Sequence, residues 1–193
     1  MKDYITSEIK KTIGTVEKIL NDKAIISLIE EIARKGADVI RKGGKLLFAG
    51  NGGSAADSQH LAAEIISRLC YDRPAMAAIA LTTDTSALTA IGNDYGYEDV
   101  FSRQMEGLGN KGDMFFAIST SGNSPNILKA LKAAKGRGVI TVGFSGQTGG
   151  KMNDLCDYMF KVPATETPKI QEGHILVGHI ICSLIEEEIH GAK

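Results

Sequence analysis

The sequence contains no tryptophan, only four prolines and only three cysteines in 193 residues. The cysteines, Cys70, Cys156 and Cys182, lie far apart and form no CxxC pair. This spacing indicates neither a disulfide framework nor a thiolate zinc site, and it is typical of buried structural thiols. We therefore expect a protein of the reducing cytoplasm.

Long apolar runs and an excess of one charge are also missing. No stretch approaches the roughly 18 apolar residues of a membrane span, and the first residues lack the apolar core of a signal peptide. The 22 Lys and Arg residues nearly balance 23 Asp and Glu residues, for a formal net charge of −1. We therefore expect neither a membrane nor a nucleic acid as partner, and an anionic ligand would have to be held by local groups.

The apolar residues that are present change their spacing along the chain. From residue 45 onward, short and wholly apolar segments alternate with segments of helical periodicity, which indicates a parallel sheet covered on both faces. We predict an α/β fold: one domain over residues 1–193, built as a three-layer α/β/α sandwich around a five-stranded parallel sheet. The predicted strands are 45–49, 75–81, 114–118, 139–144 and 158–162.

Two helices are predicted before this sheet, over residues 4–20 and 23–41. Their apolar residues recur at intervals of three and four, and Lys42-Gly43-Gly44 ends the second helix. A layered sandwich does not account for these extra apolar stripes, which are usually buried against another subunit. We expect residues 1–42 to serve in forming an oligomer.

Two glycine- and serine-rich segments follow predicted strands and lead into predicted helices over 55–68 and 125–135. They are Gly50-Asn51-Gly52-Gly53-Ser54 and Ser119-Thr120-Ser121-Gly122-Asn123-Ser124-Pro125. Such loops lie at the carboxyl edge of a parallel sheet, where backbone N–H groups and helix N-termini bind anions. The alternative is that these residues only cap helices and form turns. Neither loop has the Walker or GxGxxG pattern, which disfavours a nucleotide.

A few side chains could hold a metal ion. His60 and Glu64 are four residues apart and so share one helix face, although such a pair is also common as a surface ion pair. The predicted last helix, 170–189, adds Gln171, His174 and His179. Gln171 and His179 are roughly 12 Å apart along a helix, so they either converge on one ion or serve neighbouring subunits. Imidazole, carboxylate and amide oxygen suit zinc or a similar divalent ion.

Taken together, these segments resemble a known family. The loop from Ser119 to Ser124 resembles the phosphate loop of sugar isomerase (SIS) domains. Segments 50–54, 89–97 (TAIGNDYGY) and 170–175 (IQEGHI) are similar to phosphoheptose isomerases, and the resemblance spans about residues 5–188. That family converts sedoheptulose 7-phosphate to D-glycero-D-manno-heptose 7-phosphate, the first step of nucleotide-activated heptose biosynthesis. The resemblance implies this activity and a homotetramer with active sites at subunit boundaries.

The resemblance also implies roles for individual residues. The zinc ligands would be His60, Glu64, Gln171 and His179. The sugar-phosphate substrate would contact Asn51, Gly52, Gly53, Glu64, Asn93, Asp94, Ser119, Thr120, Ser121, Ser124 and Gln171. Segment 164–169, with Thr165, Thr167 and Pro168, does not match the substrate-facing loop of the family.

Isomerisation of a ketose to an aldose moves a proton between C1 and C2 through an enediol, which requires a base and an acid. We assign the base to Glu64 and the proton transfer between the oxygens to His179. Asp94 either orients a substrate hydroxyl or forms a turn with Asn93. Two alternatives remain open at this point. The first is an isomerase of another sugar phosphate, and the second is a non-catalytic SIS module that binds a sugar phosphate or a protein.

Overall fold

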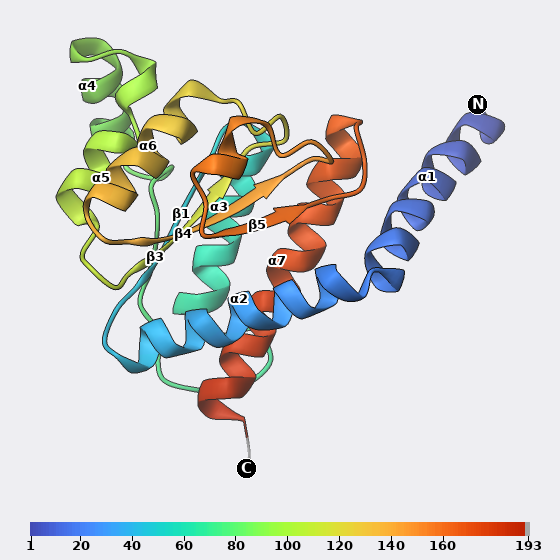
Figure 1. Cartoon of the computed structure of the whole chain (residues 1–193), viewed down its shortest axis with the longest axis horizontal. Coiled ribbons are helices and arrows are strands. Elements are labelled where there is room, and N and C mark those ends of the chain that lie inside the picture. Colours follow the sequence, from blue (N-terminus) through green and yellow to red (C-terminus); the bar gives the residue numbers. More distant parts are fainter. Residues whose placement is uncertain (192–193) are drawn as a thin grey trace.

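The computed structural model describes residues 1–191 and contains one five-stranded sheet, in which every pair of neighbouring strands is parallel. Its order is β2-β1-β3-β4-β5 (Figure 1). The strands are β1 (Leu46–Gly50), β2 (Ala78–Ala80), β3 (Met114–Ile118), β4 (Ile140–Ser145) and β5 (Tyr158–Lys161). The predicted parallel sheet of five strands is confirmed.

Helices precede the sheet and connect its strands. They are α1 (Lys2–Asn21), α2 (Lys23–Arg41), α3 (Gly53–Ile66), α4 (Thr85–Asp94), α5 (Ser102–Leu108), α6 (Pro125–Gly136) and α7 (Thr167–His190), with short 3₁₀ helices η1 (Tyr97–Asp99) and η2 (Gly150–Asp154). Among these described residues, no helix is both long and apolar enough to span a membrane.

The two faces of the sheet are covered by different helices, because successive side chains of a strand point to opposite faces. On β1, Leu46 and Phe48 belong to a core cluster shared with α2, α3 and α7. Leu47 and Ala49 belong to a second cluster shared with α5 and α6. All five residues of β1 and of β3 are buried. The predicted three-layer α/β/α sandwich is therefore confirmed.

The expectation that both N-terminal helices would be surplus to the sandwich is wrong for α2. This helix places five aliphatic residues in the first core cluster and packs against α7. The helical spacing correctly indicated an apolar face but could not tell what covers it. The residues are Ile29, Ile32, Ala33, Ala37 and Val39.

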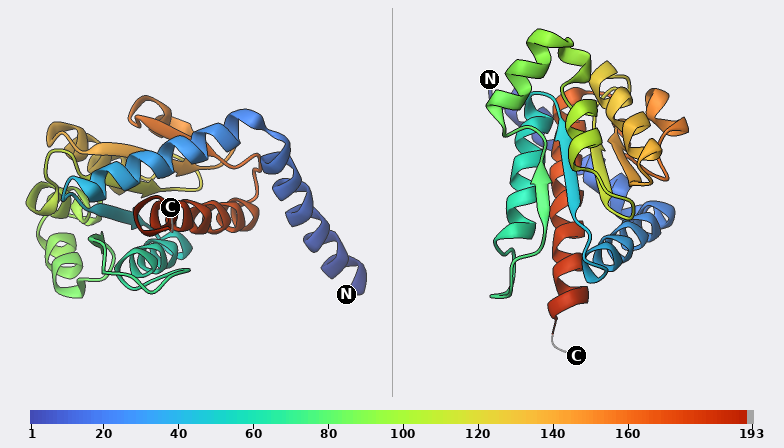
Figure 2. Two further views of the ribbon diagram at one scale, coloured as in Figure 1. Left: turned by 90° about the horizontal axis from the view of Figure 1, so that it is seen from below. Right: turned by 90° about the vertical axis from the view of Figure 1, so that its left-hand side faces the viewer.

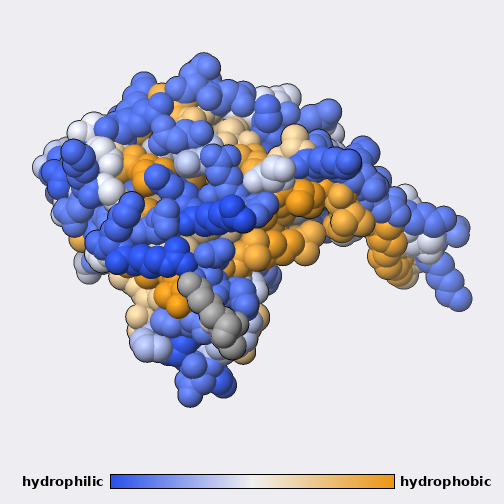
Figure 3. Space-filling view, turned by 60° about the horizontal axis from the view of Figure 1, so that its bottom comes forward, coloured by the Kyte–Doolittle hydropathy of each residue, from blue (hydrophilic) through white to orange (hydrophobic). Residues whose placement is uncertain are grey.

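Helix α1 is the true surplus element. It projects from the sandwich as an arm, which Figure 1 and the left view of Figure 2 both show. One face of the arm is exposed and apolar, and includes Ile5, Ile9 and Ile13, each at least half exposed. Apolar surface continues from the arm toward the body of the molecule (Figure 3). There Leu20 of α1, Ile26 of α2 and Ile180 of α7 line a groove of about 410 Å³.

Some boundaries and positions differ from the prediction. Strand β2 is shorter than expected, because the preceding residues run past the end of α3, where the Met76 N–H donates to the Ile65 carbonyl oxygen. Asn93 and Asp94 do not form a turn but close α4, a helix that the sequence analysis did not predict. Cys182 is buried as expected, whereas Cys70 is exposed.

Candidate active site

The two predicted phosphate loops lie side by side, because they follow neighbouring strands. β1 and β3 pair in a register that aligns Gly50 with Ile118, so both loops leave the same carboxyl edge. The first loop leads into α3 and the second into α6. At neither N-cap, Gly52 or Ser124, does a side chain cap the helix. Both helix starts therefore direct partial positive charge at this edge, although the Ile127 N–H of α6 is bonded to Asn126 Oδ1.

Two hydroxyls of the serine loop bond to one another and not to the helix end. Ser119 Oγ and Ser124 Oγ are 2.9 Å apart, and either can donate. Ser121 Oγ accepts a hydrogen bond from the Asn123 backbone N–H at 3.1 Å, which leaves its own proton available. The capping interpretation is thus wrong for Ser124, the residue in the N-cap position. A cluster of hydroxyls at the start of a helix suits a phosphate oxygen.

Gly122 allows the serine loop to pack closely on the segment that follows β4. Its φ of +65° is in the left-handed region, and a Cβ there would clash with the carbonyl oxygen of Gly149. The Gly146 N–H also donates to the Thr120 carbonyl oxygen at 3.0 Å. The loop is therefore held from behind by backbone contacts.

Three of the four predicted metal ligands come together in space. His60 and Glu64 lie on α3 and His179 on α7, and one potential ligand atom from each lies within 4.8 Å of the others. The Nε2 atoms of the two histidines are 2.7 Å apart, and His60 Nε2 is 3.3 Å from Glu64 Oε1. The side chain of Glu64 is 18% exposed, so the cluster is accessible but not fully solvated.

The donor set of this cluster fits a divalent cation. Two imidazole nitrogens that face one another can share one proton or bind one ion, and a carboxylate completes three ligands of a zinc-type site. Asp57, one turn before His60, is half-buried, and burial raises its pKa. Its Oδ2 atom is buried without a hydrogen-bond partner among the described residues.

Gln171, the fourth predicted ligand, lies against the start of α3. Its side-chain amide occupies the space that a Cβ on Gly53 would enter, with Nε2 2.6 Å from that position. Gly53 therefore lets the amide approach the backbone at the beginning of the helix that carries His60 and Glu64. This places Gln171 beside the first phosphate loop, and its role as a ligand stays a prediction.

The remaining predicted residues have different surroundings. Asn93 and Asp94 are exposed at the end of α4, where Asn93 Nδ2 donates to Asp94 Oδ1 at 2.8 Å. His174 of α7 is fully buried and packs on Phe144 and Phe160. Burial lowers the pKa of His174 to about 4, so the imidazole is a neutral core group near neutral pH.

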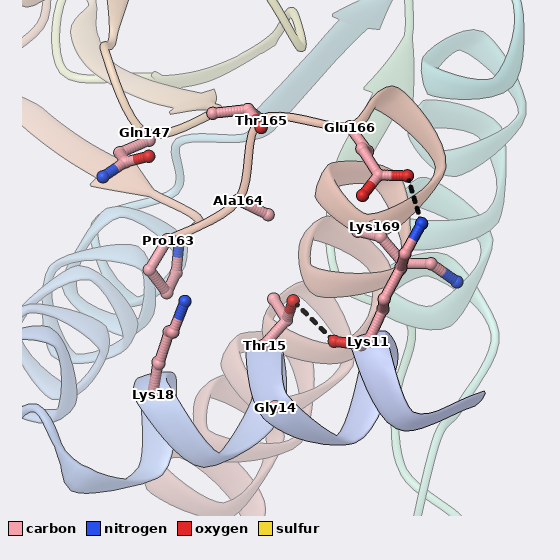
Figure 4. Close-up of a pocket in the computed structure, with 10 residues that line it drawn as sticks. All are labelled: Lys11, Gly14, Thr15, Lys18, Gln147, Pro163, Ala164, Thr165, Glu166 and Lys169. Atoms are coloured by element: carbon pink, nitrogen blue, oxygen red, sulfur yellow. Dashed lines mark hydrogen bonds and ion pairs between the residues drawn. The ribbon is translucent and has the colours of Figure 1, made fainter. Parts of the chain in front are cut away.

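The segment that did not match the family loop lines a pocket of about 320 Å³ between α1 and the start of α7 (Figure 4). Lys11 of α1 lies 3.0 Å from Glu166 and also pairs with Glu8, and these two carboxylates raise the pKa of Lys11 to about 12. Lys169 contacts Glu172 at 3.1 Å. Both lysines are already paired with carboxylates. The pair between Lys11 and Glu166 joins α1 to the start of α7 beside this pocket.

Three residues of this region were not predicted from the sequence. Asn126 and Tyr97 hydrogen-bond to Asn51 of the first loop, and Arg73 bonds to the carbonyl oxygens at the end of α3. These contacts join residues 8 to 75 positions apart in the sequence. The one available signal for Asn126 was its place directly after Ser124-Pro125 at the start of a helix.

Comparison with known proteins agrees with this architecture. The model of the SIS domain family matches residues 9–146, more than half of the chain. A phosphoheptose isomerase of Aneurinibacillus thermoaerophilus is 59% identical over 193 residues, covering 100% of this chain and 98% of that protein. The chain belongs to the phosphoheptose isomerase family of SIS-domain proteins. The family predicted from the sequence is thereby confirmed.

Solved structures of phosphoheptose isomerases share the whole fold. The enzyme from Neisseria gonorrhoeae has a TM-score of 0.90 at 40% identity, covering 96% of this chain and 98% of that one. The one from Francisella tularensis has a TM-score of 0.92 at 33% identity, covering 96% and 97%. The similarity includes the N-terminal arm, because so little of this chain lies outside the match.

Proposed function

We propose that this protein isomerises sedoheptulose 7-phosphate to D-glycero-D-manno-heptose 7-phosphate, the first step of nucleotide-activated heptose biosynthesis. The observation that carries the proposal is the cluster of His60, Glu64 and His179 on helices α3 and α7. Helix α3 begins at the first phosphate loop, so Glu64 and that loop are joined by one helix. A module that only binds a sugar phosphate has no need for this cluster.

The residues divide the reaction between them. The positive ends of α3 and α6 and the hydroxyls of Ser119, Ser121 and Ser124 bind the phosphate, with Thr120 and the Asn51–Gly53 loop beside them. Glu64 removes a proton from C1 of the ketose and returns it at C2. His179 moves a proton between the C1 and C2 oxygens as the carbonyl changes place. Asn93 and Asp94 are expected to contact sugar hydroxyls.

A zinc ion would be held by His60, Glu64 and His179, with Gln171 as fourth ligand. When bound, it supplies Lewis-acid polarisation of substrate oxygens and helps to orient them. We place the protein in the cytoplasm, where its free thiols remain reduced.

The first prediction tests the activity itself. Purified protein loaded with zinc should convert sedoheptulose 7-phosphate to an aldose phosphate, measured by NMR of the sugar. Removal of the metal by a chelator, checked by elemental analysis, should lower the rate, and added Zn²⁺ should restore it. Fructose 6-phosphate and ribulose 5-phosphate serve as competing substrates of other chain length. Absence of any conversion of sedoheptulose 7-phosphate by the loaded protein would contradict the proposal.

We further propose that the arm and the adjoining groove bind other copies of the chain, giving a homotetramer. The arm exposes Ile5, Ile9 and Ile13 in a single stripe, and the groove between α1, α2 and α7 continues it. Burial of this surface would contribute about 25 cal/mol per Å². A second copy of the chain suits this surface, because each copy presents the same apolar stripe and the stripes can cover one another.

The second prediction concerns this assembly. Light scattering should give about four times the chain mass of 20.6 kDa. Ile9→Glu combined with Ile13→Glu should yield smaller species, because two carboxylates would have to be buried. Lys10→Glu, on the polar face of the same helix, is the matched control and should leave the mass unchanged. A wild-type monomer at micromolar concentration, or equal behaviour of both variants, would refute the interface.

A further inference from the structure

Asn51 of the first phosphate loop is held by two residues that have no assigned role. Asn51 and Asn126 exchange a reciprocal pair of hydrogen bonds. Asn51 Nδ2 donates to Asn126 Oδ1 at 3.0 Å, and Asn126 Nδ2 donates to Asn51 Oδ1 at 2.8 Å. The Tyr97 hydroxyl donates to the same Asn51 Oδ1 at 3.1 Å. Asn126 is only 3% exposed, which makes it part of the framework and not a direct ligand of the substrate.

The orientation of both amides is determined by one backbone group. The Ile127 N–H donates to Asn126 Oδ1 at 2.9 Å, so this oxygen must face the helix start. Asn126 Nδ2 must then face Asn51, and Asn51 must present its oxygen to receive it. Two donors occupy Asn51 Oδ1, and one of the two Nδ2 hydrogens is bonded to Asn126. A single side-chain N–H of Asn51 is left to donate to a ligand.

We propose that Asn126 and Tyr97 are positioning residues that hold Asn51 as a one-hydrogen donor toward the sugar phosphate, which rests on the proposed function. Asn126 lies in the first turn of α6, directly after the serine loop, and Asn51 lies in the loop before α3. The amide pair therefore couples the two phosphate loops. Tyr97 lies in η1, the segment after α4, and also bonds to Asn51. Residues of three chain segments therefore fix the position of one donor.

The test is a double-mutant cycle measured by calorimetric binding of sedoheptulose 7-phosphate. Tyr97→Phe removes one hydroxyl from a residue that is 64% exposed, and should weaken binding about two- to tenfold, the range of one hydrogen bond. Asn126→Ala should weaken it by more. In an Asn51→Ala background, Tyr97→Phe should have no further effect, because Tyr97 acts through Asn51. Tyr95→Phe is the matched control, 56% exposed and two residues away, and should bind like the wild type.

Each outcome decides the proposal. Unchanged affinity in both Tyr97→Phe and Asn126→Ala would overturn it, and so would additive effects of Tyr97→Phe and Asn51→Ala. If Asn126→Ala does not fold, Tyr97→Phe alone carries the cycle. If the wild type does not bind this sugar, the proposed function fails, and the side-chain amide resonances of Asn51 become the readout. They should shift in Tyr97→Phe and stay in place in Tyr95→Phe, and the opposite result would overturn the positioning role.

Discussion

Replacing Glu64 with glutamine is expected to slow the turnover of sedoheptulose 7-phosphate by about 10²–10⁴-fold, the usual cost of losing a positioned general base. Glutamine keeps the size of the side chain and one oxygen but cannot accept the C1 proton. The fold should survive, because Arg73 bonds to the carbonyl oxygen of Glu64 and not to its side chain. Steady-state rates with the sugar, and unfolding curves of both proteins, provide the measurement.

A control and a companion variant sharpen this result. Glu188→Gln removes a carboxylate that is 43% exposed and pairs with Arg41 of α2, outside the groove and the metal-ligand cluster, and it should leave the rate unchanged. His179→Gln should lower turnover as strongly as Glu64→Gln, since it removes both the proton carrier and a ligand from the cluster. Binding of the sugar phosphate should persist in both, because the serine loop follows a different strand. Wild-type turnover by Glu64→Gln would show that the base lies elsewhere.

The buried ion pair between Arg73 and Glu186 is expected to give the largest loss of stability. Arg73 Nε is 2.9 Å from Glu186 Oε1, and the two side chains are 2% and 0% exposed. Arg73 also donates to the carbonyl oxygens of Glu64 and Ile65, the last turn of α3. Burial alone would raise the pKa of Glu186, but backbone N–H groups and the Arg73 guanidinium hold it below its usual value. The pair thus ties the end of α3 to α7.

Arg73→Ala should therefore lower the free energy of unfolding by about 3–5 kcal/mol, because it leaves a carboxylate buried without its partner. Urea unfolding at one fixed protein concentration gives the value. Arg41→Ala is the matched control. Arg41 of α2 pairs with Glu188, which lies on α7 like Glu186, but both side chains of this pair are 43% exposed. Its cost should be about 0–1 kcal/mol. Equal losses in the two variants would refute a special role of the buried pair.

The fold could be predicted from the sequence where burial dictates composition. Met114–Ile118 coincides with the predicted strand because a strand covered on both faces is apolar throughout. Helix α4, between β2 and β3, was not predicted: none of its residues is fully buried, and only Leu88 and Ile91 of this short helix pack against the second core cluster. The apolar stripe of α2 was recognised, but its burial against α7 depends on residues about 150 positions later in the sequence.

The site divides in the same way. The four-residue spacing of His60 and Glu64 is visible in the sequence because both lie on one helix. His179 is 119 residues from His60, and only the resemblance to a family placed the two together. The pairing of Asn51 with Asn126 and of Arg73 with Glu186 has no local pattern at all. Such contacts depend on how loops approach one another in the folded protein, and the spacing of apolar residues along the sequence does not indicate this.

The packing of α2 on α7 also bears on how the chain folds. These helices come from opposite ends of the described sequence, and together they cover one face of the sheet. Closing so long a loop has an entropic cost that must be met before the contact stabilises anything. We therefore expect the sheet face that carries Leu46, Phe48 and Phe116 to remain exposed to water until late in folding. A folding intermediate at that stage would expose an aromatic surface and aggregate with other partly folded chains.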